Sequence, residues 1–467
     1  MRLAMLTLLL ALLLAAPPAF AGEIVTCEKA DGYRGIWYFN QPSGDEYKYK
    51  YSGGLGTYPQ QLIPFAVYAP EAKKTFFCWG GRPKDENRLV HMVAWFDHAT
   101  GTVPRPRILM DKGTRDAHDN PTILLGPGGH VFILSSAHGT ARPAYIHRSV
   151  EPYRVDRFQR VLVKNFSYAQ AWRVPEEGIL FLHTRYAGPR RFLYWVTSPD
   201  GVRWPGWEEP KRLARIDHGH YQVSARRGGT VATAFNYHPR GKGLNARTNL
   251  YYLATDDFGR TWRNAAGEAV EVPLTTTEEA APALVHDWEA DGLLVYLKTV
   301  QFDAGGRPVL LLLTSRGYAS GPKNAPRTWR TARWTGTGWT IRPVTPSDHN
   351  YDFGPLYIEP DGTWRLIAPT ETGPQPYNTG GEVAMWTSRD QGATWKKVRP
   401  LTRGSEFNHT YVRRPVDAHP DFYALWADGH GRHESPSRLY FTNRAGDHVW
   451  RLPTEMTGET AKPEVVW

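Results

Sequence analysis

Histidine, tyrosine and arginine side chains recur in this chain at the ends of short apolar segments. Histidines and tyrosines stand just before one segment of a pair, or just after the second: Tyr58, His118, His138, Tyr168, Tyr186, His218, His220, His238, His349, His409 and His430. Arginines begin the segment that follows such a pair: Arg142, Arg190, Arg191 and Arg247. Imidazole and phenol groups can exchange protons, and a guanidinium binds a carboxylate through two hydrogen bonds.

This set of groups suits β-elimination at a uronate sugar. The reaction needs the sugar carboxylate neutralised, a base that removes the C5 proton, and an acid that protonates the departing O4. Histidine or tyrosine could supply the proton transfers, and arginine could bind the carboxylate. A single histidine at such a position can equally be a structural hydrogen-bonding group, so the indication comes from the set.

The charge balance favours an acidic partner. The chain has 56 Lys and Arg residues against 46 Asp and Glu, a formal charge of +10. Basic surfaces concentrate polyanions, and for an exported protein an anionic polysaccharide is a better partner than nucleic acid. An arginine-rich genome would produce a similar modest excess.

The N-terminus has the pattern of a signal peptide. Arg2 precedes the apolar stretch Leu3–Ala16, and Ala19-Phe20-Ala21 is a small-x-small cleavage site. No later stretch is apolar for long enough to span a membrane. We therefore predict a signal peptide over residues 1–21 and one domain over residues 22–467, secreted or periplasmic and monomeric. Cys27 and Cys78 could form a disulfide or remain two free thiols.

Three segments with one motif indicate the fold. Each has a hydroxyl residue, an Asp, a Gly and a Trp in the Asp-box order: Ser198–Trp204, Thr255–Trp262 and Ser388–Trp395. In this motif the Asp caps a tight turn, the Gly takes a left-handed conformation and the Trp packs onto the sheet. Recurrence at intervals of this size is typical of a β-propeller, in which the motif has a structural role.

Seven pairs of apolar segments, each joined by a Gly- or Pro-containing turn, predict seven four-stranded blades. The pairs are Leu62–Val67 and Thr75–Trp79; Pro121–Leu125 and Val131–Ser135; Ala169–Val174 and Ile179–His183; Tyr221–Ala225 and Val231–Phe235; Ala283–Asp287 and Leu293–Lys298; Leu356–Glu359 and Trp364–Ala368; Tyr411–Pro415 and Tyr423–Ala427. The predicted fold is an all-β, seven-bladed β-propeller with Asp-box repeats. We expect Tyr33–Phe39 to add an edge strand that closes the ring.

Several segments resemble the BNR-4 repeat family, and the resemblance covers nearly the whole of residues 22–467. They are Gly32–Tyr38, Asp116–Pro121, His183–Tyr186, Gly219–Gln222 and Asn236–Pro239. That family is similar to seven-bladed propeller lyases that cleave ulvan, a sulfated rhamnose–uronate polymer. The resemblance implies a lyase whose catalytic residues are His118, His138 and Tyr186, the two histidines being twenty residues apart across one hairpin. It implies no cofactor for the chemistry.

The resemblance leaves the arginine and the metal open. Arg191, Arg215 and Arg247 are the candidates for binding the substrate carboxylate. The ulvan lyases hold a structural metal with cysteine ligands, but this chain has no cysteine after Cys78. A zinc or calcium site is therefore absent or altered, and the histidines that could replace it are His220, His349 and His409.

Two other functions fit part of the pattern. Sialidase-like hydrolases also use Asp-box propellers, but they need an arginine triad and an early Arg-Ile-Pro motif, which this sequence lacks. A non-catalytic glycan-binding propeller would need aromatic and arginine residues on the same face, but not the histidines and the tyrosine together.

Overall fold

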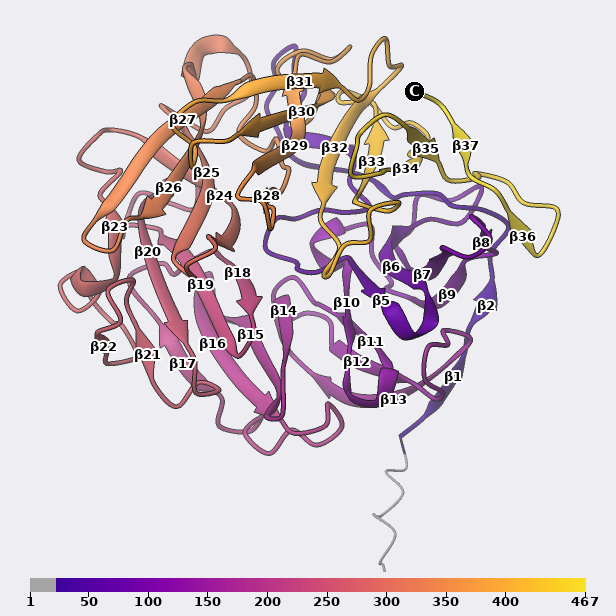
Figure 1. Cartoon of the computed structure of the whole chain (residues 1–467), viewed down its shortest axis with the longest axis horizontal. Helices are drawn as coiled ribbons and strands as arrows, with labels where there is room; N and C mark the ends of the chain where they lie inside the picture. Colours follow the sequence, from indigo (N-terminus) through magenta and orange to yellow (C-terminus); the bar gives the residue numbers. More distant parts are fainter. Residues whose placement is uncertain (1–21) are drawn as a thin grey trace, which may run out of the picture.

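The computed structural model describes residues 22–467, so the predicted signal peptide lies outside the described residues. Seven antiparallel sheets follow one another in chain order around a central axis (Figure 1). Apart from two N-terminal strands that lie on outer edges, the first strand of each sheet lies nearest the axis and later strands lie farther out. The predicted seven-bladed, all-β propeller is confirmed.

Blades 1 and 2 each carry one of the two N-terminal strands on the outer edge, and blade 3 has four strands. Blade 1 contains β5 (Ala66–Ala69), β6 (Lys74–Gly81), β7 (Val90–Asp97), β9 (Arg107–Asp111) and β2 (Glu28–Lys29). Blade 2 contains β10 (Pro121–Leu125), β11 (Val131–Ser135), β12 (Ala144–Ser149), β13 (Arg157–Lys164) and β1 (Ile24–Thr26). Blade 3 contains β14 (Ser167–Val174), β15 (Gly178–Ala187), β16 (Arg190–Ser198) and β17 (Lys211–Ala214).

The other four blades complete the ring. Blade 4 contains β18 (Gln222–Arg227), β19 (Thr230–Tyr237), β20 (Thr248–Thr255), β21 (Trp262–Arg263), β22 (Ala269–Val270) and β23 (Leu284–His286). Blade 5 contains β24 (Leu294–Phe302), β25 (Pro308–Ser315), β26 (Arg327–Trp334) and β27 (Trp339–Ser347). Blade 6 contains β28 (Leu356–Ile358), β29 (Trp364–Glu371), β30 (Glu382–Ser388) and β31 (Lys396–Pro400). Blade 7 contains β32 (Asn408–Arg413), β33 (Ala424–Gly429), β34 (Leu439–Thr442), β35 (Val449–Arg451) and β37 (Glu464–Val465).

The remaining described elements are short. Two further strand pairs are β3 (Trp37–Pro42) with β4 (Tyr49–Gly54), and β8 (Val103–Pro104) with β36 (Thr460–Ala461). The helices described are single 3₁₀ turns: η1 (Pro70–Ala72), η2 (Ala117–Asp119), η3 (Pro127–Gly129), η4 (Ala281–Ala283) and η5 (Pro322–Asn324).

The fifth hairpin was predicted in the wrong place. Ala283–Asp287 contains β23, which pairs with β20 in blade 4. The inner hairpin of blade 5 is β24 with β25, joined by a turn that contains Gly306 at φ +81°. Two apolar segments around Asp291-Gly292 resemble a hairpin locally, but they belong to adjacent blades.

The ring is not closed by an edge strand at Tyr33–Phe39. That segment overlaps β3, which pairs only with β4. Closure instead uses the C-terminal strand β36, which pairs with β8 in the loop of blade 1. The backbone N–H of Tyr33 also donates to the carbonyl of Pro453 at 2.8 Å. The ends of the chain therefore join the first and last blades outside the blade sheets.

The Asp-box turns form as expected. In Thr255–Trp262, Asp257 Oδ1 accepts hydrogen bonds from the backbone N–H groups of Arg260 and Thr261, both at 2.9 Å. The Thr255 hydroxyl accepts from the N–H of Gly259 at 2.8 Å. Gly259 has φ +84°, and a Cβ there would lie 2.5 Å from Trp195, so the turn requires glycine.

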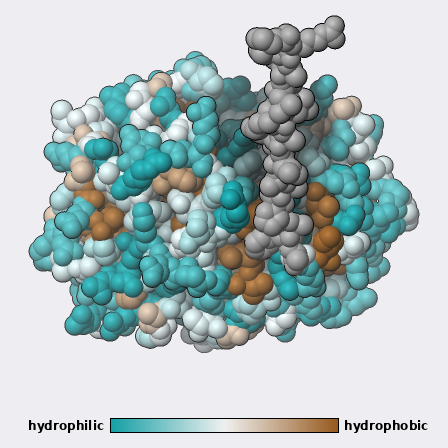
Figure 2. Space-filling view, turned by 90° about the horizontal axis from the view of Figure 1, so that it is seen from below, coloured by the Kyte–Doolittle hydropathy of each residue, from teal (hydrophilic) through white to brown (hydrophobic). Residues whose placement is uncertain are grey.

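Both cysteines are free and buried. Burial raises the pKa of the Cys27 thiol to about 12, so the thiols behave as apolar core groups. Within residues 22–467, no helix is long and apolar enough to cross a membrane. Hydrophilic residues dominate the visible face in Figure 2, with small hydrophobic patches between them.

Candidate active site

A polar pocket lies at the end of the central axis where the inner strands begin. Its lining includes Tyr168 at the start of β14 and Arg191 at the start of β16. Tyr186 is not a lining residue, but its hydroxyl contacts both of these side chains. The full lining is Asn40, Gln41, Lys50, Tyr51, Tyr58, Gln60, Gln61, His118, His138, Tyr168, Arg191, Tyr221, Leu244, Arg247 and Tyr351. From the set of strand-end residues that the sequence analysis named, six lie together in this pocket: Tyr58, His118, His138, Tyr168, Arg191 and Arg247.

Asp116 holds the two histidines of the pocket together. Its Oδ1 lies 2.5 Å from Nδ1 of His118, and its Oδ2 lies 2.8 Å from Nδ1 of His138. The two imidazole rings stack with centroids 4.0 Å apart. Asp116 also caps the 3₁₀ turn η2 by accepting from the N–H of His118. Burial acts to raise the pKa of Asp116, but the two imidazoles hold it well below its usual value.

The two histidines differ in what their second nitrogen contacts. Nε2 of His118 lies 2.6 Å from the hydroxyl of Tyr58 and 3.0 Å from that of Tyr51. The His118 side chain is 7% exposed, whereas that of His138 is 24% exposed. Burial lowers the pKa of His118 to about 4, so it is neutral at physiological pH. Because Nδ1–H of His138 donates to the Asp116 carboxylate, its Nε2 carries the lone pair.

Asp119 fixes the backbone that carries His138. Its Oδ1 accepts from the N–H of His138, and its Oδ2 accepts from Nε of Arg142 at 2.9 Å. The Asp119 carboxylate is completely buried. A buried carboxylate with these partners fixes the backbone of His138 and so the position of its ring in the stack.

Tyr186 comes from the next blade and faces His138. Their ring centroids lie 5.8 Å apart at an interplanar angle of 77°. The Tyr186 hydroxyl accepts from Nε of Arg191 at 2.9 Å and lies 3.4 Å from the hydroxyl of Tyr168. Burial, partly opposed by Arg191, raises the pKa of Tyr186 to about 12. The phenol is therefore protonated at neutral pH.

Two buried guanidiniums border the same pocket. Nη2 of Arg247 donates to the hydroxyl of Tyr351 at 2.8 Å. Nη1 of Arg191 and Nε of Arg247 are buried without a hydrogen-bond acceptor among the described residues. The Tyr221 ring lies between them, with centroid distances of 5.6 Å to Arg191 and 4.7 Å to Arg247. Burial acts to raise the pKa of Tyr221, but the two cations together hold it below its usual value.

Lys50 adds a basic amine to the lining, close to the two guanidiniums. Its Nζ donates to Oδ1 of Asn245. Burial, together with the charges of Arg247 and Arg191, lowers the pKa of Lys50 to about 6. The effect of Arg191 and Arg247 on Lys50 shows that the pocket concentrates positive charge, which an anionic ligand would compensate.

Arg215, the third arginine of the prediction, does not lie with these two in the pocket. Arg215 is exposed and follows β17, the outermost strand of blade 3, and its backbone N–H donates to the carbonyl of Leu274. The periphery of a blade is far from the central axis, so Arg215 does not line the pocket. Arg191 and Arg247 do line it.

The three histidines suggested as metal ligands do not form one site. Each is buried with both ring nitrogens hydrogen-bonded: His220 to Ile216 and Asn236, His349 to Tyr351 and Lys50, and His409 to Trp426 and Ser405. Their role in the described structure is to join segments of the blades by hydrogen bonds, and they are absent from the described groups with ligand spacing.

Asp116, His118 and His138 have donor atoms close enough to hold a metal ion. In this structure those donors already bond to one another, with a carboxylate between two imidazole N–H groups. Each imidazole Nδ1 therefore has an acceptor without a metal, and the carboxylate orients the histidines as it orients a histidine base in a catalytic triad.

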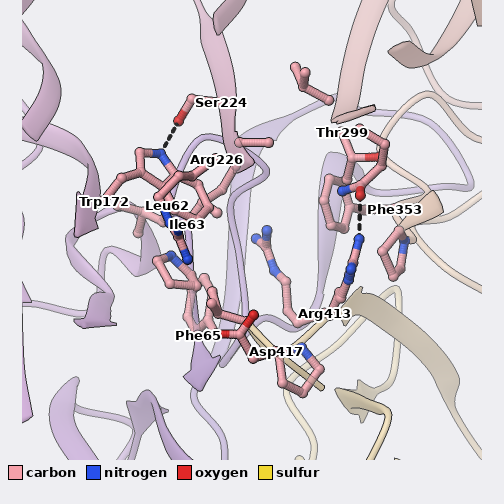
Figure 3. Close-up of a pocket in the computed structure, with 18 residues that line it drawn as sticks. Leu62, Ile63, Phe65, Trp172, Ser224, Arg226, Thr299, Phe353, Arg413 and Asp417 are labelled. Carbon is pink, nitrogen blue, oxygen red and sulfur yellow. Dashed lines mark hydrogen bonds between the residues drawn. The ribbon is translucent and has the colours of Figure 1, made fainter. Parts of the chain in front are cut away.

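A second pocket opens at the other end of the axis, where the inner strands end (Figure 3). Leu62, Phe65, Trp172 and Phe353 supply apolar lining. Its buried Arg413 donates to backbone carbonyls on the segment before β5. The lining contains no histidine or tyrosine, so it lacks groups suited to proton transfer near neutral pH.

The sequence pattern missed several residues of the first pocket. Asp116 stands inside the same motif as His118, and its position as the residue before a 3₁₀ turn was the available signal. Lys50 and Tyr51 come from β4, outside the blades, and nothing in strand periodicity points to them. Tyr351 precedes the inner strand of blade 6, two residues after His349, and its position before that strand was the available signal.

Comparison with known proteins places the chain among proteins of this architecture. A curated ulvan lyase from Nonlabens ulvanivorans is 23% identical over 354 residues, which is 67% of this chain and 71% of the relative. A solved structure of a PL25 ulvan lyase has a TM-score of 0.69 and 18% identity, covering 88% of this chain and 95% of that one. The structure of the polysaccharide lyase Uly1 has a TM-score of 0.59 and 13% identity, covering 90% and 99%.

The structural similarities support the propeller fold. The sequence model of the BNR repeat-containing family matches residues 82–347, which is more than half of the chain. That region extends from blade 1 to the last strand of blade 5 and includes the triad, Tyr186 and both pocket arginines. The chain belongs to the BNR repeat-containing family.

Proposed function

We propose that this protein is a polysaccharide lyase that cleaves a uronate-containing anionic polysaccharide, of the ulvan type, by β-elimination. The observation that carries the proposal is the pair of buried guanidiniums of Arg191 and Arg247. Each has a buried nitrogen with no hydrogen-bond acceptor among the described residues. Neither has a carboxylate partner among the described ion pairs. An uncompensated buried cation is costly, and a uronate carboxylate would satisfy both.

Binding the carboxylate also prepares the reaction. Neutralising the charge beside C5 makes the C5 proton more acidic, and fixed donors stabilise the negative charge that develops as the proton leaves. Tyr221 lies between the two guanidiniums. Its ring would keep their spacing constant while the sugar binds.

His138 is the proposed base. Asp116 accepts from its Nδ1–H, which directs the Nε2 lone pair away from the carboxylate. His118 has the same contact with Asp116, but its Nε2 is occupied by Tyr58 and Tyr51. The sequence alone suggested His118 and Tyr186 as the base and acid pair, in either order, with His138 helping to neutralise the uronate carboxylate. These contacts instead favour His138 as the base and make His118 a positioning residue.

Tyr186 is the proposed acid. Its oxygen accepts from Arg191, so its own proton remains available to a substrate oxygen. In the reaction, the C5 proton goes to Nε2 of His138 as the C4–C5 double bond forms. The C4–O4 bond breaks, and the Tyr186 proton goes to O4, which leaves one unsaturated uronate end and one hydroxyl end.

The pocket favours this reaction over hydrolysis. Glycoside hydrolases of the common type use two carboxyl groups beside the scissile bond, and none of the residues lining this pocket is Asp or Glu. A purely glycan-binding propeller would need no hydrogen-bonded Asp–His pair. The ulvan lyase relatives point to a uronate polymer as substrate.

The proposal extends to where the protein acts. With the predicted signal peptide over residues 1–21, it would be exported and would act as a single-domain monomer on a polymer outside the cytoplasm. Size-exclusion chromatography of the secreted protein and N-terminal sequencing would test both statements. Intact residues 1–21 on the exported protein would contradict the cleavage.

Incubation of the purified protein with ulvan and other uronate polymers, followed by ultraviolet absorbance, tests the reaction. We expect an unsaturated product from the wild type and a loss of about 10²–10⁴-fold in rate for Tyr186→Phe and His138→Gln. Tyr153, between β12 and β13, does not line the polar pocket, so Tyr153→Phe is the matched control and should stay active. Products without unsaturation would contradict elimination, and cleavage that survives both substitutions would contradict the site.

A further inference from the structure

A second cluster of metal-binding side chains lies where the first and last blades meet. His98 directly follows β7 in blade 1, and His419 and Asp421 lie in the turn between β32 and β33 in blade 7. One donor atom from each of the three lies within 4.8 Å of the other two. The imidazole ring centroids of His98 and His419 are 3.8 Å apart.

His98 presents an unused nitrogen in this cluster. Its Nε2 is hydrogen-bonded to the hydroxyl of Thr75 at 2.8 Å, which sets the orientation of the ring. Its Nδ1 is buried and has no hydrogen-bond partner among the described residues. A buried nitrogen without a partner is costly unless something binds it. A hydrogen bond on the far nitrogen is the usual support of a metal-ligating histidine.

The other two ligands are held by the same short turn. The backbone N–H of Asp421 donates to Nδ1 of His419 at 3.2 Å, and a carboxylate oxygen of Asp421 lies 3.7 Å from that nitrogen. The Tyr68 ring packs against both histidines, with centroid distances of 5.2 Å to His98 and 4.8 Å to His419. The Asp421 side chain is 65% exposed, which leaves access for an ion and for a bound water.

We propose that His98, His419 and Asp421 bind a divalent transition metal ion, with Zn²⁺ as the best fit, and that the ion ties blade 1 to blade 7. Two imidazoles and one carboxylate suit zinc, with a water as fourth ligand. Calcium and magnesium prefer oxygen ligands throughout. His98 follows the third strand of blade 1, just as the Asp-box turns follow the third strands of blades 3, 4 and 6. The site therefore lies on the face opposite the polar pocket, and the ion would be structural.

The position gives such an ion a defined effect. Blades 1 and 7 are adjacent around the axis (Figure 1), and the N–H of Tyr68 in β5 donates to the carbonyl of Val416, in the segment that follows β32. A cross-link at this joint holds together segments more than 300 residues apart in sequence. An ion that binds only the folded ring raises its stability by mass action.

Equilibrium dialysis of the purified protein against Zn²⁺ alone, with metal analysis, measures the binding. We expect one zinc ion per chain at this site, lost in His419→Gln and bound at least about tenfold more weakly in Asp421→Asn. Asp421→Asn alters an exposed side chain, so it tests the site even if a histidine variant folds poorly. His448→Gln, an exposed histidine elsewhere in blade 7, is the matched control.

His138→Gln separates this site from the triad in the polar pocket, and it should keep the bound zinc. Zinc should also raise the Tm of the wild type and of His138→Gln, but not that of His419→Gln. The proposal is overturned if His419→Gln and Asp421→Asn bind zinc like the wild type, or if only His138→Gln loses it. Absence of zinc binding by the wild type at 100-fold excess also overturns it. None of these results depends on lyase activity.

Discussion

At the scale of single residues, hydrogen-bond direction decides the chemistry of the pocket. Asp116 accepts from Nδ1 of both histidines, so each ring is held as one tautomer with its lone pair on Nε2. Tyr58 then occupies that nitrogen in His118, whereas Nε2 of His138 has no hydrogen bond to a residue in the described range 22–467. Two histidines of the same motif therefore have different roles.

Replacement of Asp116 by Asn should reduce kcat by about 10²–10⁴-fold, because an amide can favour the wrong tautomer of His138. KM should change little, since Asp116 does not line the pocket. Steady-state kinetics on ulvan measure both constants. Asp111→Asn, at an exposed ion pair with Arg88, is the control and should match the wild type. An unchanged kcat in Asp116→Asn would show that the triad does not take part.

The pocket arginines should differ from Arg215 in their effect on catalysis. Arg191→Gln and Arg247→Gln should each lower kcat/KM by about 10²–10³-fold, because each removes a donor for the substrate carboxylate. Arg215→Gln removes the same charge from an exposed position and should stay within about twofold. Equal losses in all three variants would indicate a general effect of net charge on the polyanion.

At the scale of elements, the Asp-box turns support the blades on the face away from the pocket. Asp257 accepts hydrogen bonds from the N–H of Arg260, the N–H of Thr261 and the hydroxyl of Thr261. Although burial acts to raise it, these hydrogen bonds lower the pKa of Asp257 to about 2. The stabilisation is complete above the unfolded pKa near 4 and is lost as pH falls through 2.

Asp257→Ala should lower the free energy of unfolding by about 1.5–3 kcal/mol, the usual contribution of hydrogen bonds to a charged group. Activity per folded molecule should not change, because the turn is remote from the pocket. Urea denaturation measures the loss. The adjacent Asp256→Ala is the matched control, since Asp256 is exposed and 3.8 Å from Arg263. Equal stability of the two variants would show that the box geometry contributes nothing.

At the scale of the whole molecule, buried neutral histidines make the propeller sensitive to acid. Burial lowers the pKa to about 4 in His147 and His220, and to about 3 in His183 and His409. The unfolded chain titrates near 6.5 and so binds more protons than the folded chain below that pH. The stability from these groups is complete above 6.5 and is lost as pH falls through 4 and 3.

The free energy of unfolding should therefore fall between pH 6.5 and 4, by up to about 1.4 kcal/mol per pH unit for each such histidine. Urea titrations at several pH values measure the slope. His147→Leu removes one titrating group and should flatten the profile, while the exposed His448→Gln should leave it unchanged. A stability that does not vary between pH 6.5 and 4 would contradict the assignment of these histidines as buried and neutral.

Local patterns in the sequence determined the propeller, because strands, glycine turns and Asp-boxes are formed by residues close together in the chain. Six of the seven hairpins follow from them, and so does the gathering of histidine, tyrosine and arginine at the inner-strand starts. The fifth hairpin was misplaced, since β23 is apolar like an inner strand but pairs with β20. Local pattern does not distinguish pairing within a blade from pairing across a blade boundary.

The tertiary structure alone decided how the side chains combine. Arg191, Arg215 and Arg247 are equivalent in sequence, but distance from the axis separates the exposed Arg215 from the two that line the pocket. His118 and His138 differ in the contacts of Nε2, because Tyr51 and Tyr58, which lie outside blade 2, contact that nitrogen in His118. Such contacts join residues tens to hundreds of positions apart, and their geometry exists only once the ring has closed.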